Sequence, residues 1–126
     1  MMNEIDRLKV VNALEEVLRD EKFRVAPKSS AFLRYVVLQT LDGQQHRIKA
    51  YTIAVEALHK PSSFDPQEDP SVRVLAKRLR DMLAEYYGNT ESHEVILQLI
   101  PGNYIPKFIM SGRIVESVEK PQGGVY

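Results

Sequence analysis

The sequence predicts a mainly α-helical domain that ends in a small β-hairpin. Four segments space their apolar residues three and four positions apart, which is the periodicity of helices that pack one face on a core. Two β-favouring runs follow the last of these segments. The chain has 126 residues, enough for one hydrophobic core, so we expect a single domain over residues 1–110. Residues 111–126 lack a sustained period and are expected to form a flexible tail.

The first predicted helix covers residues 5–18 and ends near Asp20. Residues 1–21 contain six acids against three bases, so this helix is acidic. We expect it to complete the core or to pair two protomers. Its apolar positions follow one helical face: Ile5, Leu8, Val11, Leu14, Val17 and Leu18.

The second predicted helix follows Pro27. Ser29 and Ser30 are expected to cap its start, because their side chains can accept hydrogen bonds from free N–H groups. Apolar residues cover most of its circumference, which is typical of a helix that packs on several sides. Asp42-Gly43 is expected to close it.

A short third helix should run from near Tyr51 to about His59, where apolar residues recur at i, i+3, i+4 and i+7. Residues 60–70 contain three prolines and are predicted to form a loop. The fourth helix should start at Pro70, since Asp69 is a good N-cap and proline suits the first helical position. Gly88-Asn89 can supply a left-handed termination after it.

The last two predicted elements are strands over residues 95–100 and 104–109, separated by Pro101-Gly102-Asn103. A short helix, a connector, a longer helix and a hairpin follow one another in this part of the chain. That order predicts a winged helix-turn-helix fold with a three-helix core and a wing, to which the first helix is an addition.

Composition excludes several classes of protein. The 17 basic and 17 acidic residues cancel, which argues against a highly basic protein that coats nucleic acid. The absence of cysteine excludes disulfides, thiol catalysis and thiolate metal sites. No stretch approaches the roughly 18 apolar residues of a membrane span, and the N-terminus does not have the pattern of a signal peptide. We therefore expect a cytoplasmic protein without a membrane anchor.

Catalysis is not expected. The three histidines, His46, His59 and His93, are isolated in the sequence and fall in loops or at the ends of predicted elements. No Gly-rich phosphate loop follows a predicted strand. The sequence therefore predicts no catalytic residue, no metal site and no cofactor.

The fourth predicted helix carries the candidate site. Arg73, Lys77 and Arg80 recur at i, i+4 and i+7 and share one stripe, which Arg78 flanks, and no acid interrupts residues 73–80. Ser71 could donate to a phosphate at the helix start. Guanidinium groups can bind phosphate or the acceptors of guanine, so the stripe is a candidate for DNA binding. The alternative is an ordinary solvated helix face.

Two sequence blocks resemble a known family. Residues 72–80, followed by residues 96–104, resemble the end of the OmpR/PhoB-type effector domain, a winged helix-turn-helix that binds DNA. A bacterial module that often precedes tetratricopeptide or signalling domains is a closer match, and the similarity spans roughly residues 29–108. The matching motifs are Phe64-Asp65-Pro66-Gln67, Asp69-Pro70, Val72-Arg73-Val74, Arg78-Leu79-Arg80, Tyr86-Tyr87 and Pro101-Gly102-Asn103-Tyr104.

The resemblance implies that Arg73, Lys77, Arg78 and Arg80 face DNA, and that Asn103 and Lys107 lie on or beside the wing. The chain departs from the OmpR/PhoB-type domain at its start, because that domain opens with a small β-sheet and this chain opens with a helical pattern.

We expect a sequence-specific regulator of transcription that binds double-stranded DNA, as a homodimer or as adjacent copies. The alternative is a winged-helix adaptor or antiactivator that binds another regulator protein. The acidic first helix and the zero net charge favour this alternative, in which DNA affinity would be weak and insensitive to Arg73.

Overall fold

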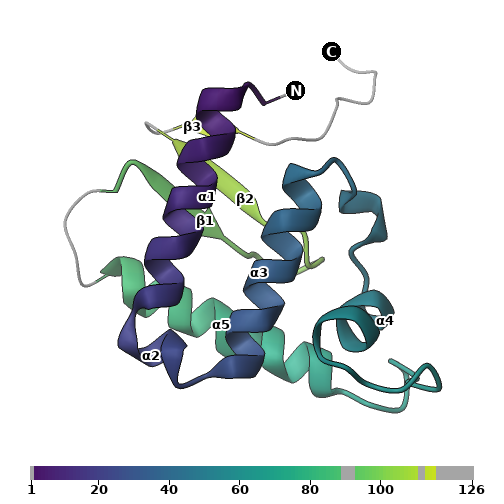
Figure 1. Cartoon of the computed structure of the whole chain (residues 1–126). Coiled ribbons are helices and arrows are strands. Elements are labelled where there is room, and N and C mark those ends of the chain that lie inside the picture. Colours follow the sequence, from purple (N-terminus) through teal and green to yellow (C-terminus); the bar gives the residue numbers. More distant parts are fainter. Residues whose placement is uncertain (1, 89–92, 111–112, 116–126) are drawn as a thin grey trace.

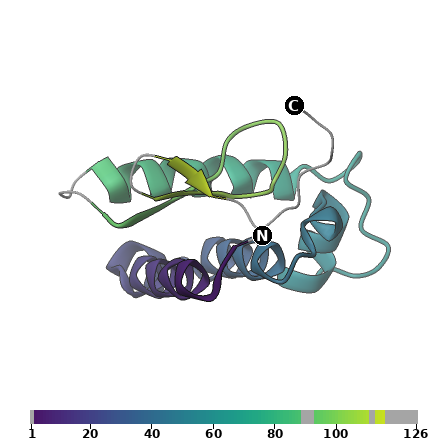
Figure 2. The same ribbon diagram turned by 90° about the horizontal axis from the view of Figure 1, so that it is seen from above.

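The computed structural model describes residues 2–88, 93–110 and 113–115 of the chain. This part of the chain forms two layers (Figure 1 and Figure 2). The helices of the N-terminal half make one layer, and the last helix and a small antiparallel sheet make the other. The protein is therefore mainly helical with a small antiparallel sheet, which confirms the predicted fold class at this level.

Helix α1 (Glu4–Arg19) places one apolar face in the core. The Asn3 side chain caps its start by accepting from the Asp6 N–H group at 2.7 Å. Helix α1 packs on strand β1 (Val95–Gln98). The first helix therefore completes the core, which is one of the two roles expected from the sequence. Its buried residues are Val10, Ala13, Leu14 and Val17.

Helix α3 (Pro27–Leu41) begins earlier than predicted. The short helix α2 (Glu21–Arg24) precedes it. Ser29 and Ser30 lie inside the first turn of α3, and the Ser30 Oγ donates to the Phe23 carbonyl oxygen at 2.7 Å. Their predicted capping role is therefore wrong. The reason is Pro27, whose φ is already helical and which has no N–H group to satisfy, so the helix starts without a side-chain cap.

The third predicted helix is present, with a widened last turn. Helix α4 (Ala50–Thr52) continues into η2 (Ile53–Ala57), a π-helical turn in which the Leu58 N–H group donates to the Ile53 carbonyl oxygen at 3.1 Å. A 3-10 turn, η1 (Gln45–Arg47), connects this region to α3. Gly43 adopts a φ of 74° just after α3, which confirms the predicted closure of that helix.

Helix α5 (Ser71–Gly88) starts one residue after the predicted position. The Asp69 carboxylate accepts from the Ser71 N–H group at 2.9 Å, as expected of an N-cap. Gly88 is the last residue of the helix and does not adopt a positive φ, so the predicted left-handed termination at Gly88 is wrong. Glycine permits that conformation without requiring it. Asn89 lies outside the described residues.

The predicted hairpin is present with shorter strands. Strand β1 pairs with β2 (Lys107–Met110) in an antiparallel register from Val95↔Met110 to Gln98↔Lys107. A third strand, β3 (Arg113–Val115), pairs with β2, so the prediction of a flexible tail is wrong for residues 113–115. A three-residue strand is too short to produce a recognisable alternation in the sequence. The rest of the predicted tail, apart from β3, lies outside the described residues.

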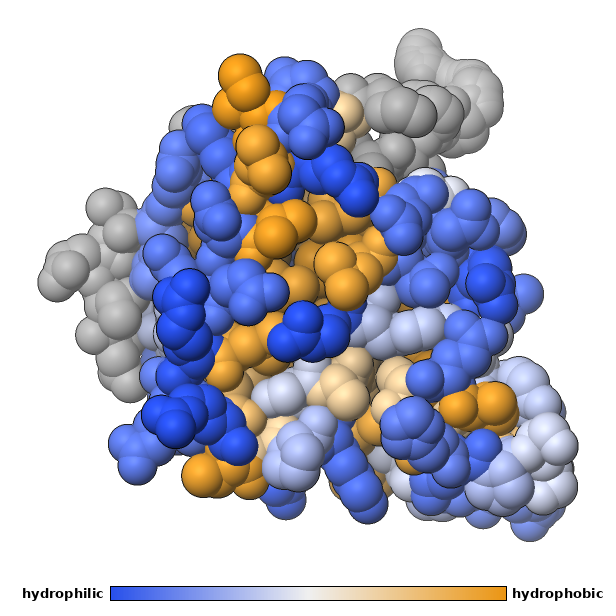
Figure 3. All heavy atoms as spheres, viewed as in Figure 1, coloured by the Kyte–Doolittle hydropathy of each residue, from blue (hydrophilic) through white to orange (hydrophobic). Residues whose placement is uncertain are grey.

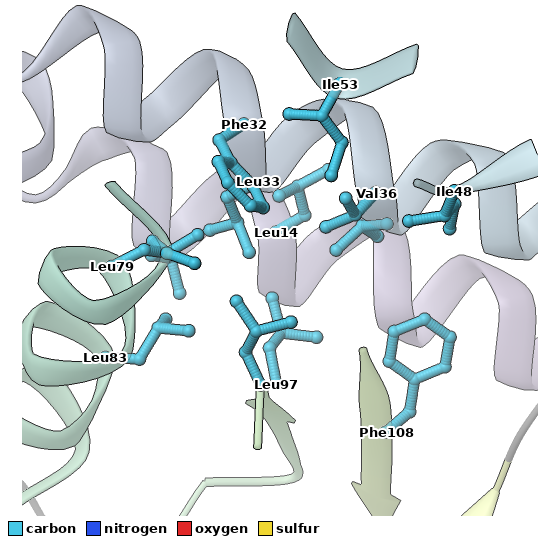
Figure 4. Close-up of a cluster of buried hydrophobic side chains, with 14 of the residues drawn as sticks. Leu14, Phe32, Leu33, Val36, Ile48, Ile53, Leu79, Leu83, Leu97 and Phe108 are labelled. Carbon is cyan, nitrogen blue, oxygen red and sulfur yellow. The ribbon is translucent and has the colours of Figure 1, made fainter. Parts of the chain in front are cut away.

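The core lies between the two layers. Figure 4 shows side chains from α1, α3, α5 and the sheet pointing toward one another. Alternate strand residues complete it, since Val95 and Leu97 of β1 and Phe108 and Met110 of β2 are buried. The fully buried members contributed by the helices include Leu14, Phe32, Leu33, Val36, Ile53 and Leu79.

Tyr87 joins the end of α5 to the sheet. Its hydroxyl oxygen accepts from the Leu97 N–H group of β1 at 3.0 Å. Its ring packs edge-on against Tyr86 and His93, with centroid distances of 4.9 Å in both cases. Burial raises the pKa of Tyr87 to about 12, because the phenolate would lose its hydration.

We expect Tyr87→Phe to lower the free energy of unfolding by about 1 to 3 kcal/mol, because the Leu97 N–H group loses its acceptor. The folded-state pKa of Tyr87 lies above the ordinary value of 10.0. The contribution of the neutral Tyr87 side chain to the free energy of unfolding is therefore complete below pH 10 and declines as the pH rises toward 12. Urea unfolding of both proteins at pH 7 and across pH 9 to 12 measures the two effects.

Tyr86→Phe is the matched control, because the Tyr86 hydroxyl makes no hydrogen bond within the described residues. A Tyr87→Phe protein as stable as the Tyr86→Phe protein would show that the link to Leu97 contributes nothing.

Candidate functional site

A groove brings together three of the predicted site residues. Arg73 and Arg80 of α5 line it on one side, and residues 101–104 of the β1–β2 loop, including Asn103, line it on the other. Its volume is about 260 Å³. The two arginines are seven positions apart and therefore share one side of the helix. We call this depression the α5–loop groove.

Local geometry fixes the loop side of the groove. Gly102 has a φ of 118°, a backbone conformation that favours glycine. The Asn103 Oδ1 accepts from the Ile105 N–H group at 2.8 Å, which closes a turn and leaves the amide NH₂ group as the part of Asn103 that can donate to a ligand. The Tyr104 ring packs edge-on against Phe32 of α3, with a centroid distance of 6.0 Å.

The outward side of α5 combines cations with two acids. Lys77 lies 3.0 Å from the Asp81 carboxylate in an i,i+4 pair, and Glu85 pairs with Lys22 of α2. All four side chains are well exposed. Pairs of this kind stabilise a protein by about 0 to 1 kcal/mol and exchange readily for other partners. A DNA phosphate would therefore have to displace Asp81 from Lys77, at a small cost in free energy.

Arg78 and Ser71 also line a second depression. Arg78 flanks the basic stripe as predicted, since Arg73, Lys77, Arg78 and Arg80 together line a shallow depression of about 580 Å³ on the outward side of α5. Arg78 lies five positions, or about 140°, from Arg73 around the helix. Together with Ser71 it lines a cavity of about 340 Å³ between the starts of α3 and α5, which we call the α3–α5 pocket.

Two further cations line the α3–α5 pocket, Lys28 and Lys60. The sequence did not indicate them, because neither shares a periodic pattern with α5. Lys28 lies in the first turn of α3, and Lys60 lies in the loop before α5. The path of the chain alone brings them to Arg78.

Lys107 lies apart from both depressions. It is the first residue of β2, opposite Gln98 in the register, and its side chain is half-buried. It is not among the residues that line the α5–loop groove or the α3–α5 pocket. The structure therefore does not bring Lys107 together with the other predicted site residues.

The acids that precede α5 have local partners. The Asp65 Oδ1 accepts from the Gln67 N–H group at 3.0 Å. Asp69 caps α5 and lies 3.6 Å from the Lys60 ammonium group. The backbone N–H group of Ser71 is the main cause that holds the pKa of Asp69 below its usual range. Turn formation therefore accounts for Asp65, and helix capping accounts for Asp69, as predicted for Asp69.

The three arginines of α5 differ from Lys77 in their partners. Within the part of the chain that the structure describes, Arg73, Arg78 and Arg80 form no ion pair. Arg73 makes a long hydrogen bond, 3.4 Å, from its Nη1 to the Pro66 carbonyl oxygen. Guanidinium groups without an acidic partner are available for planar acceptors such as phosphate and the edge of guanine.

Comparisons with known proteins give no further assignment, because no protein-family model, no curated protein and no solved structure matches the chain. Among residues 2–88, 93–110 and 113–115, no group of three histidine or acidic side chains is placed to hold a metal ion. No helix in the same residues is both long enough and apolar enough to cross a bilayer.

Proposed function

We propose that the protein is a sequence-specific regulator that binds double-stranded DNA through a winged helix-turn-helix. The observation that carries this proposal is the α5–loop groove, where two arginines that have no acidic partner among the described residues face the β1–β2 loop. In the proposed arrangement α5 is the recognition helix in the major groove, η2 and the loop before α5 complete the helix-turn-helix, and the β1–β2 hairpin is the wing.

In the proposed complex, different residues on and near α5 would contact the bases and the phosphates of DNA. Arg73 is exposed near the start of the helix, where recognition helices contact base edges. Arg80 is half-buried beside the loop and suits a phosphate at the edge of the groove. Arg78 and Ser71 suit a phosphate near the helix start. Lys77 would have to exchange Asp81 for DNA, and Asn103 would donate from its amide group.

We expect Arg73→Ala to lower affinity for the best DNA site by about 1 to 3 kcal/mol and to relax specificity at one base position. Selection of bound fragments from a genomic library, followed by titration of the selected sequence, measures both effects. Arg34→Ala is the matched control, since Arg34 lies in the opposite layer and pairs with Glu15. Equal losses in the two variants, or no selected sequence in either, would contradict base reading by Arg73.

We expect Asp81→Asn to raise DNA affinity several-fold, because Lys77 loses its competing carboxylate. Each additional phosphate contact changes the slope of log affinity against log salt by about −0.9, so the slope should become steeper by about one. Glu15→Gln changes the net charge equally without touching α5 and should leave both quantities close to the wild-type values. An identical response in the two variants would mean that Lys77 does not face DNA.

A second candidate function rests on the surface of α1 and α3. Ile5 is 65% exposed, Leu8 53% and Leu38 37%. Figure 3 shows hydrophobic side chains gathered over α1 and the neighbouring part of α3, and α5 lies in the layer behind them (Figure 2). Contiguous apolar surface of this kind suits a protein partner. We name it the α1–α3 face and propose it for homodimerisation or for docking on a partner regulator.

We expect the wild-type protein to self-associate and Leu8→Glu to be monomeric at the same concentration, with unchanged helical content. Light scattering after size exclusion, at several loading concentrations, measures the mass. Glu16→Lys is a control with an exposed position on the same helix. A monomeric wild-type protein at all concentrations would remove the homodimer and leave the partner regulator as the occupant of this face.

A further inference from the structure

The α3–α5 pocket has the size and the walls of a small-molecule site. Its volume is about 340 Å³, and ligand pockets in proteins begin at about 300 Å³. Leu58, Val74 and Leu75 provide apolar walls. A phosphate of DNA would need only the charged rim, whereas the apolar walls suit the body of an organic molecule.

The rim of the pocket is cationic. Lys28, Lys60 and Arg78 come from three separate parts of the chain, and no acidic residue lines the cavity. Asp69 lies next to Lys60 at 3.6 Å and offsets one of the three charges. The positive end of α5, a helix of 18 residues, begins at Ser71 in the same cavity. An anion is therefore the favoured ligand.

Ser29 is an independent indication of a ligand. Its side chain lines the pocket although the residue is only 2% exposed, so the exposed part of Ser29 faces the cavity. The Ser71 Oγ lines the same pocket and is enclosed without a hydrogen bond of good geometry, although the hydroxyl helps to lower the pKa of the nearby Asp69. Enclosed hydroxyl groups without good partners are costly and uncommon.

We propose that the α3–α5 pocket binds a small organic acid. The carboxylate of this acid contacts Lys28, Lys60 and Arg78, and its apolar body contacts Leu58, Val74 and Leu75. Ser29 donates a hydrogen bond to the acid group. Since Val74 and Arg78 belong to α5, the occupied pocket withholds Arg78 from DNA and lowers DNA affinity. This regulatory consequence rests on the proposed DNA binding, whereas the binding of the acid does not.

Benzoate is the probe, added to the full chain labelled with ¹⁵N in the absence of DNA, with benzamide and acetate as controls. We expect saturable shifts of amide signals at the starts of α3 and α5 with benzoate. Benzamide lacks the charge and acetate lacks the apolar body, so both should bind at least about fivefold more weakly.

Arg78→Gln and Ser29→Ala should each weaken benzoate binding by about fivefold or more. Arg80→Gln, on the other side of the same helix, should not change it. Retained dispersion of the amide spectrum identifies folded variants, and Lys28→Gln at an exposed position replaces any variant that fails to fold. Absence of saturable shifts, or equal weakening by Arg80→Gln, would overturn the site.

Acetate and inorganic phosphate that bind as tightly as benzoate would also overturn the proposal, since the pocket would then hold only an anionic group, such as a DNA phosphate. DNA titration with and without saturating benzoate separates the two proposals. Benzoate binding without any DNA binding leaves the pocket in place and rejects the DNA-binding function alone.

Discussion

The burial of one stripe of α5 is the constraint on which the candidate site depends. Val72, Ala76, Leu79 and Leu83 are almost completely buried, against α3 on one side and β1 on another. Placing this stripe in the core removes apolar area from water and fixes the rotation of the helix about its axis. Every other side chain of α5 then has a set direction, including the four cations.

The rotation of α5 decides which depressions its cations line. Arg73 and Arg80 line the α5–loop groove, Arg78 lines the α3–α5 pocket, and all three line the outward depression of α5 together with Lys77. The hydrogen bond from Leu97 to Tyr87 and the contact of Tyr104 with Phe32 hold the sheet and its loop against the helices. A single packing arrangement therefore supports both the proposed DNA surface and the proposed acid site, and it explains how an occupant of one can affect the other.

The two layers of the fold present different chemistry to their surroundings. The layer of α5 and the sheet carries arginines that have no acidic partner among the described residues, whereas the layer of α1 and α3 gathers the exposed side chains of Ile5, Leu8 and Leu38 on one face. Since the two surfaces lie on different layers, a protein partner on the α1–α3 face leaves α5 accessible. The proposed DNA binding and the proposed protein docking are therefore compatible in one molecule.

The sequence by itself determined the features that depend on short-range spacing. Helical periodicity located α1, α3, α5 and the α4–η2 segment, Asp69 located the start of α5 to within one residue, and Pro101-Gly102-Asn103 located the connection between the strands. The i, i+4, i+7 spacing of Arg73, Lys77 and Arg80 follows directly from helical geometry. Each of these features needs only neighbours along the chain.

Only the tertiary structure decided which distant residues share a surface. Lys28 and Lys60 meet Arg78 because α3, the loop before α5 and α5 itself pack together, and no local pattern encodes that meeting. The short strand β3 depends in the same way on its pairing with β2 rather than on propensity. Side chains far apart in the sequence become neighbours only when the buried faces of their elements have been matched, because burial of apolar area selects one arrangement of the elements.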